Sequence, residues 1–113
     1  MTNIVFFKKD NLILGFSCSG HTGYGEVGYD IVCSALSSLT QSCAMGLKDV
    51  LKIKIDMKKD DKQGYLKVVL PKDIEKSKLR DSQILLDTLY ISISDIAKNY
   101  SKYIKLEERE YVY

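Results

Sequence analysis

Apolar residues near the N-terminus fall into two short segments that predict a β-hairpin. Residues 4–7 and 12–18 are mostly apolar, and Asp10-Asn11 between them are residue types that favour a tight turn. Apolar and polar residues alternate along the second segment, as expected of a half-buried strand. The residues predicted to share its inner face are Leu12, Leu14, Phe16 and Cys18.

The hydrophobic period changes to that of a helix between Tyr29 and about Ala44. Apolar residues recur there at steps of three and four, and serines and alanines fill most of the other positions. Gly46 follows directly and is a plausible C-terminal stop. We therefore expect a helix that packs closely against a sheet.

A second pair of strands is predicted in the middle of the chain. Residues 48–57 alternate between apolar and charged side chains, which is typical of a half-buried strand. A polar KKDDKQG turn follows, and the returning strand runs from Tyr65 to Leu70, where Pro71 ends it.

The remaining chain predicts a long helix and a short edge strand. Residues 73–100 carry an apolar stripe at helical spacing, which includes Leu86, Tyr90, Ile93, Ala97 and Tyr100. The tail, YIKLEEREYVY, could add a strand at the sheet edge. The expected fold is α+β, a β-β-α-β-β-α(-β) two-layer sandwich with both helices on one sheet. Residues 1–113 are expected to form a single domain.

Composition and charge exclude several classes of function. A net charge of +2, with lysines scattered among nearly as many carboxylates, argues against direct binding to nucleic acid. No segment approaches the roughly 20 apolar residues that cross a membrane, and the N-terminus lacks a signal peptide. Three cysteines, an odd number, point to a reducing compartment with free thiols, so we expect a cytoplasmic protein.

Four glycines in nine residues, Gly20, Gly23, Gly25 and Gly28, predict a flexible loop before the first helix. The last three fit the G-x-G-x-x-G spelling of a dinucleotide-binding turn. That motif needs a tight strand-to-helix turn inside a parallel βαβ unit, whereas the strand here belongs to a hairpin and about ten loop residues intervene. We therefore expect no nucleotide cofactor, and interpret the glycines as a loop that lets a peptide backbone come close.

Cys33 and His21 are the candidate catalytic pair. Cys33 is predicted in the first turn or so of the helix, where unpaired N–H groups and the helix dipole favour a thiolate. The same N–H groups could stabilise an oxyanion. His21 is the only histidine, and its loop is long enough to bring the imidazole to the thiol.

Two polar residues flank this pair, and two other interpretations of the cysteines remain open. Asp30 could cap the helix or orient His21, and Ser37 could bond near the thiol or simply pack closely. Cys33 could instead be a buried small hydrophobe, as Cys18 and Cys43 are expected to be. Cys18, His21 and Cys33 could also bind zinc, although they include no close C-x-x-C pair, and we expect no metal.

The segment GHTGYGEVGYDIVCSALSSL resembles the signature of the bacterial ribosomal-processing cysteine protease family, Prp. In that family a Gly-His pair opens a glycine-bearing loop, and Gly-x-Asp-Ile-Val-Cys begins the first helix, followed by small residues and a serine. The matching residues here are Gly20-His21, Gly28, Asp30-Ile31-Val32-Cys33 and Ser37. Length and element order are similar over essentially the whole chain.

The resemblance implies a His–Cys dyad with His21 as base and Cys33 as nucleophile, and places Asp30 and Ser37 near the active site. It implies cleavage of the N-terminal extension of the ribosomal protein L-twenty-seven, after an aromatic pair, by a homodimer without a cofactor. The alternative is a non-enzymatic ribosome-assembly module that clasps a ribosomal protein or RNA with the same loop.

Overall fold

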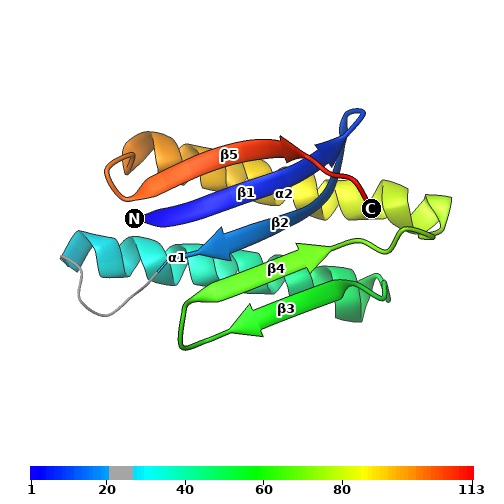
Figure 1. The fold of residues 1–113 in the computed structure, drawn as a ribbon, viewed down its shortest axis with the longest axis horizontal. Helices are drawn as coiled ribbons and strands as arrows, with labels where there is room; N and C mark the ends of the chain where they lie inside the picture. The colour runs from blue at the N-terminus through cyan, green and yellow to red at the C-terminus, as the bar shows by residue number, and fades with distance from the viewer. Residues whose placement is uncertain (21–26) are drawn as a thin grey trace.

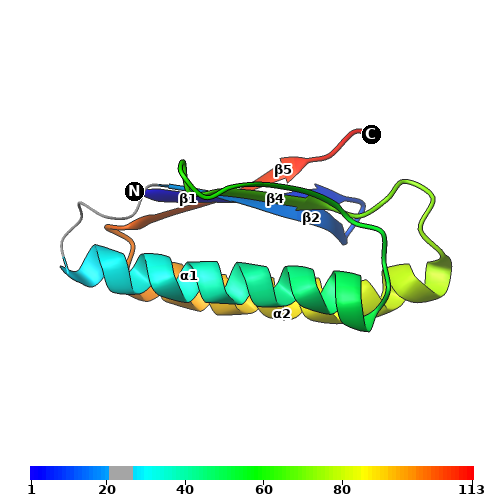
Figure 2. The same cartoon turned by 90° about the horizontal axis from the view of Figure 1, so that it is seen from below.

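A five-stranded sheet covered on one face by two helices forms the fold (Figures 1 and 2). The computed structural model describes residues 1–20 and 27–113, and the side chains of residues 1–20 and 31–113. The strand order is β3-β4-β2-β1-β5; β5 is parallel to β1, and the other neighbours are antiparallel. The elements are β1 (Thr2–Lys9), β2 (Leu12–Ser19), α1 (Val27–Met45), η1 (Gly46–Val50), β3 (Asp56–Asp60), β4 (Tyr65–Val69), α2 (Lys76–Asn99) and β5 (Ile104–Glu110). The predicted two-layer α+β sandwich is confirmed, and so is the edge position of the last strand.

The β1–β2 hairpin forms at the predicted turn but contains an irregularity that the alternation did not reveal. Asp10 and Asn11 both have positive φ, 55° and 56°, which suits the tight turn of a right-twisted hairpin. Phe7 pairs with Gly15 and Lys8 with Ile13, so Leu14 is an extra residue in β2. The extra residue reverses the alternation, and Ile13 rather than Leu14 joins the core cluster. The prediction that Leu12 and Leu14 share the face of Phe16 was therefore wrong.

The segment after α1 differs most from the prediction. Gly46 does not end the helix; a π-helical turn, η1, continues to Val50, and Lys52 then leaves it with a φ of 56°. Gly46 packs against α2: a Cβ there would lie 2.9 Å from a methyl carbon of Leu85, which would have to shift. Residues 48–55 are therefore helix and connection, and β3 begins only at Asp56.

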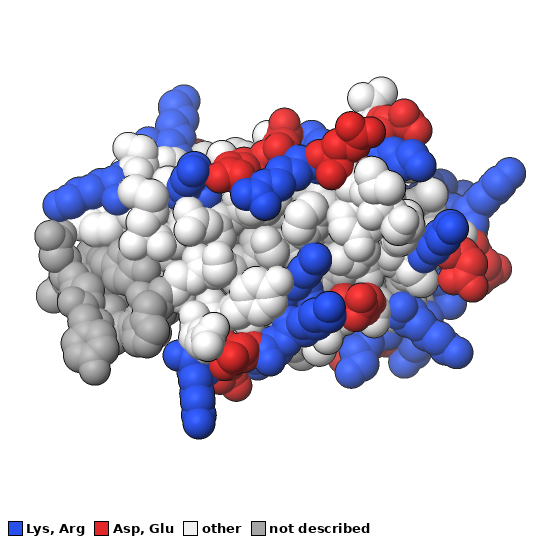
Figure 3. Space-filling view, viewed as in Figure 1, with Lys and Arg blue, Asp and Glu red and all other residues white. Residues whose placement is uncertain are grey.

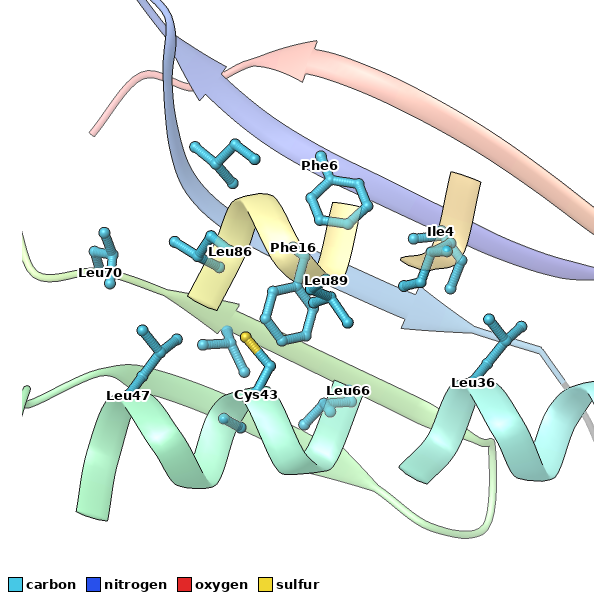
Figure 4. Close-up of a cluster of buried hydrophobic side chains, with 14 of the residues drawn as sticks. Ile4, Phe6, Phe16, Leu36, Cys43, Leu47, Leu66, Leu70, Leu86 and Leu89 are labelled. Atoms are coloured by element: carbon cyan, nitrogen blue, oxygen red, sulfur yellow. The ribbon is translucent and has the colours of Figure 1, made fainter. Parts of the chain in front are cut away.

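The core lies between the helices and the sheet, as Figure 4 shows. Phe6 and Phe16 from the hairpin are fully buried, and the Phe6 ring meets Tyr90 of α2 edge-on at 5.0 Å. Leu86 and Ile93 of the predicted α2 stripe are also fully buried, which confirms most of that stripe. Tyr100 is 47% exposed at the end of α2, so its inclusion was wrong.

In the part of the chain that the structure describes, the other face of the sheet carries no helix, and it is partly apolar. Phe7 is nearly buried there by Tyr111, whose ring lies 5.4 Å away, and by Lys67 above its ring. Figure 3 shows this face, with an uncharged band along the sheet and most charged side chains toward its margins. In the described ranges, neither α1 nor α2 combines the length and apolar character that a membrane span requires.

Candidate active site

Cys33 lies on the sheet-facing side of α1, with its side chain only 5% exposed. Its sulfur is 3.4 Å from Oγ1 of Thr2, the first residue of β1, and either atom can donate the hydrogen bond. Thr2 is held in turn by its backbone N–H, which donates to the carbonyl of Tyr103 at 2.8 Å. The thiol therefore faces the end of the sheet where β1 begins and β2 ends.

Gly20, directly after β2, packs against the same threonine. A Cβ at Gly20 would lie 2.8 Å from the Thr2 Cα and 2.9 Å from its Oγ1, closer than atoms can approach without moving. The Gly20 N–H also donates to the carbonyl of Gly64 in the β3–β4 turn at 3.1 Å. Only glycine lets the chain leave the sheet at this point, one residue before His21 and beside the neighbour of Cys33.

Cys18 is a second thiol at this end of the sheet. It lines the same pocket as Cys33, on the face of β2 that points to the helices. Burial raises the pKa of the Cys18 thiol to about 11, and its electrostatic interaction with nearby Cys33 adds to the rise. A thiol with such a pKa stays protonated near neutral pH, so Cys18 is a poor nucleophile there.

A pocket of about 160 Å³ opens beside Cys33, between α1 and the β3–β4 hairpin. Polar side chains continue along it from the thiol. Gln41 donates through Nε2 to the Ser37 hydroxyl at 2.7 Å, and Lys59 of β3 donates to the Gln41 carbonyl oxygen at 3.5 Å. Lys59 also pairs with Asp61 at 3.5 Å. We call this space the catalytic pocket; it has one apolar, thiol-bearing end and one polar, exposed side.

The structure brings Cys33, Ser37 and Gly20 to this pocket. Ser37 is exposed and its hydroxyl accepts a hydrogen bond from Gln41, which argues against the alternative that it simply packs closely. Three predicted residues, His21, Gly23 and Gly25, lie outside the described residues. Gly28 and Asp30 belong to α1, so the expectation that Gly28 lies in the loop was wrong, and the Asp30 side chain lies outside the described residues.

The start of α1 changes two expectations. The helix begins at Val27, so Cys33 is its seventh residue rather than one in the first turn. The N–H groups that have no partner within the helix belong to its first four residues. At a rise of 1.5 Å per residue, these residues lie about 5–9 Å from Cys33 along the helix axis, toward its N-terminus. They are therefore not at the thiol, and the direct benefit expected for a thiolate or an oxyanion was overstated. Asp30 is the fourth helical residue, so it is not the N-cap.

The other two cysteine expectations can be compared with the structure. Cys43 is 8% exposed in the core, where burial raises its pKa to about 12, as expected of a buried small hydrophobe. Within the described residues there is no group of three histidine, cysteine or acidic side chains that could hold a metal. The zinc alternative includes His21, which lies outside them.

Sequence reasoning missed Thr2, Gln41 and Lys59 as parts of the site. A threonine at the second position and a glutamine within a helix are ordinary by composition. Only the distance between them and the predicted nucleophile in three dimensions identifies them. The i, i+4 spacing of Cys33, Ser37 and Gln41, which places them along one side of a helix, was the available signal.

Comparisons with known proteins agree with the geometry. A family model described as cysteine protease Prp matches residues 1–105. The ribosomal processing cysteine protease Prp of Bacillus subtilis (strain 168) is 22% identical over 105 residues, which cover 88% of each chain.

Solved structures share the fold over nearly the whole chain. A protein from Streptococcus mutans superposes with a TM-score of 0.87 at 25% identity, covering 98% of this chain and 96% of that one. The essential ribosomal processing protease Prp from S. aureus, solved in complex with a substrate peptide, gives a TM-score of 0.84 at 21% identity. That match covers 96% of this chain and all of the other.

Proposed function

The chain belongs to the cysteine protease Prp family, whose members process ribosomal protein, and from this premise we propose its substrate and catalytic residues. The proposed substrate is the N-terminal extension of the bacterial large-subunit ribosomal protein L-twenty-seven. The proposed mechanism uses a dyad of His21 and Cys33. One observation carries the proposal: the Cys33 sulfur lies in the catalytic pocket and contacts Thr2, against which Gly20 packs. His21 follows Gly20 directly in the chain.

Cleavage begins when the His21 imidazole takes the proton of the Cys33 thiol. The thiolate attacks the scissile carbonyl carbon, and a C–S bond forms as the carbonyl becomes an oxyanion. The oxyanion collapses, the C–N bond breaks, and the imidazolium gives its proton to the leaving amine. Water, deprotonated by the same imidazole, then attacks the thioester carbon. The C–S bond breaks, the acid product leaves, and the imidazolium returns its proton to the Cys33 sulfur. The Thr2 hydroxyl is placed to donate to the sulfur whenever it is charged.

In the proposed mechanism, Asp30 and Ser37 support His21 and Cys33 but do not contact the scissile bond. Asp30 lies in the first turn of α1, where a carboxylate stabilises the helix dipole and could orient His21. Ser37 lies one turn after Cys33, and its hydroxyl accepts the Gln41 amide. The proposal gives Ser37 the role of ordering the polar side of the pocket.

Gly20, Gly23 and Gly25 belong to the proposed substrate loop, and Gly28 follows it as the second residue of α1. Residues without a Cβ let a peptide backbone approach closely, and Gly20 is already required by its contact with Thr2. We further propose that the enzyme acts as a homodimer in the cytoplasm, where ribosomal proteins are made, and needs no cofactor.

The test is mass spectrometry of a synthetic peptide that spans the junction of the L-twenty-seven extension. We expect the purified protein to cut the peptide after its aromatic pair under reducing conditions. Cys33→Ala and His21→Ala should both fold and leave the peptide intact. The control is Cys43→Ala, which removes a thiol of the same helix that is buried in the core. Per folded molecule, this variant should cut the peptide at the wild-type rate.

Two outcomes would contradict the proposal. Cleavage by Cys33→Ala at the normal rate would exclude Cys33 as the nucleophile. Tight binding of the peptide by the wild-type protein without any cleavage would favour the alternative, a non-enzymatic ribosome-assembly module. The oligomeric state is checked by sedimentation of the same protein.

A further inference from the structure

The catalytic pocket continues into a second pocket further along α1. The second pocket has a volume of about 170 Å³ and lies where the end of α1 faces β3. Gln41, Lys59 and Leu66 line both pockets. The two pockets therefore form one groove between the helix and the β3–β4 hairpin, which we call the α1–β3 groove.

The far end of this groove is open and mostly apolar, with the exposed Lys48 and Asp49 of η1 also lining it. Met45 of α1 is 61% exposed and Met57 of β3 is 42% exposed, on either side of the second pocket. Ala44 and Leu66, both buried, line its base. Methionine side chains adapt their shape to an apolar partner, and exposed methionines that line one pocket suit a peptide-binding surface.

The junction between the pockets is polar. The Gln41 amide and the Lys59 ammonium lie there, and their 3.5 Å hydrogen bond joins α1 to β3. This bond is long and exposed, so exchanging it for bonds to a peptide costs little. An extended peptide offers a backbone carbonyl or N–H at every residue, which suits both side chains.

The length of the groove sets a spacing along the peptide. Met45 lies twelve residues after Cys33 in one helical segment, which is about 18 Å at 1.5 Å per residue. An extended peptide advances about 3.3 Å per residue, so this distance corresponds to about five peptide residues.

We propose that the α1–β3 groove holds one arm of the substrate peptide in an extended conformation, with the second pocket binding an apolar side chain about five residues from the scissile bond. This inference rests on the proposed function, because the peptide is the one cut at Cys33. Met45 and Met57 are then specificity-determining residues that act by binding, at a distance from the reacting atoms. The continuity of the second pocket with the catalytic pocket selects a peptide substrate over an unrelated partner protein.

Peptide binding without turnover gives the direct test. The fluorescein-labelled extension-junction peptide is titrated into Cys33→Ala and into Cys33→Ala carrying Met45→Gln and Met57→Gln, with anisotropy as the readout. Glutamine keeps the length of methionine but loses its apolar character, so we expect Kd to rise about tenfold. The matched control is Cys33→Ala with Ile91→Gln, since Ile91 is 67% exposed on α2; its Kd should stay that of Cys33→Ala.

A cleavage assay separates this inference from the proposed function. In the otherwise wild-type protein, Met45→Gln with Met57→Gln should raise KM about tenfold for the long peptide and leave kcat unchanged. A peptide cut back to three residues on each side of the scissile bond should show the same KM with both proteins. An unchanged Kd and KM for the long peptide would overturn the groove assignment while the protease assignment stands. Binding that responds to the methionines without any cleavage would support the groove and reject the proposed protease reaction.

Discussion

Replacing Gly20 by alanine tests whether the exit of the chain from β2 positions Cys33, the proposed nucleophile. The added Cβ would lie 2.8 Å from the Thr2 Cα, against an ordinary contact of at least 3.4 Å, so Thr2 or residue 20 must move by about 0.6 Å. Thr2 cannot move alone, because its N–H is bonded to Tyr103 and its Oγ1 contacts the Cys33 sulfur. The displacement therefore reaches the thiol.

The expected loss of activity exceeds the expected loss of stability. Overpacking of this kind costs about 1–3 kcal/mol, and we expect the lower half of that range because Thr2 lies at a strand end. A catalytic group must be held within about 0.5 Å of its productive position, so kcat/KM should fall about ten- to a hundredfold. Urea denaturation gives the free energy of unfolding, and peptide cleavage gives kcat/KM.

The matched substitution is Gly15→Ala, in the middle of the same strand. Its Cβ would lie 2.3 Å from the Val68 carbonyl oxygen, a more severe overlap than at Gly20, but away from the catalytic pocket. Gly15→Ala should therefore lose more stability, about 3 kcal/mol, and keep the kcat/KM of its folded fraction close to that of the wild type. If Gly20→Ala kept wild-type activity, or if both variants lost activity only in proportion to unfolding, the positioning role of Gly20 would be refuted.

Three further expectations concern stability and pH. Leu86→Ala should lower the free energy of unfolding by about 3 kcal/mol in urea, because the side chain is fully buried and leaves a cavity; a loss below about 1 kcal/mol would contradict the described core. Lys52→Gly should raise the free energy of unfolding by about 0.5–1 kcal/mol, because a φ of 56° strains any residue with a Cβ; a lower melting temperature would contradict that conformation. The pKa of Cys18 is raised from 9.0 to about 11 and that of Cys43 from 9.0 to about 12, so the folded state holds these protons more strongly. The protonated thiols therefore make their full contribution to the free energy of unfolding below pH 9, and this contribution is lost as the pH rises toward 12. Urea midpoints at pH 8 and 10.5 should show the fall in stability, and the fall should be smaller in Cys43→Ala.

The sequence was sufficient for the elements whose local signals agree with their tertiary environment. The Asp10-Asn11 turn needs two residues that tolerate positive φ, and both residue types do. The α2 stripe is long and regular, and its central residues are buried.

Predictions failed where packing between distant elements decides the conformation. The alternation in residues 48–57 is typical of a strand, but the structure buries the side chains of this region in another way. Leu47 is buried as part of the helical turn η1, and Ile53 as part of the connection that follows it. Gly46 is a helix-stop residue by type, yet its absent Cβ makes room for Leu85. No local pattern reports that contact.

Local sequence signals likewise predicted one part of the candidate site, and the other part depends on tertiary structure. The identity of Cys33 as a candidate follows from a local signature, whereas its depth in α1 depends on where the helix starts. The groove and the Thr2 contact depend on the sheet order, which places the start of β1, the end of β2 and the β3–β4 hairpin beside one helix (Figure 1).

The pairing of the first strand with the last has a consequence for how the enzyme is made. Thr2 pairs with Ile104 and bonds to Tyr103, so the residue beside Cys33 is held in part by a segment about a hundred residues later in the chain. During synthesis the β1–β2 hairpin and α1 can form early, since their contacts are local, but β1 keeps an unpaired edge until β5 has emerged. A nascent chain therefore completes this end of the sheet only after β5 has emerged, which delays proteolytic activity until the chain has been made as far as Glu110.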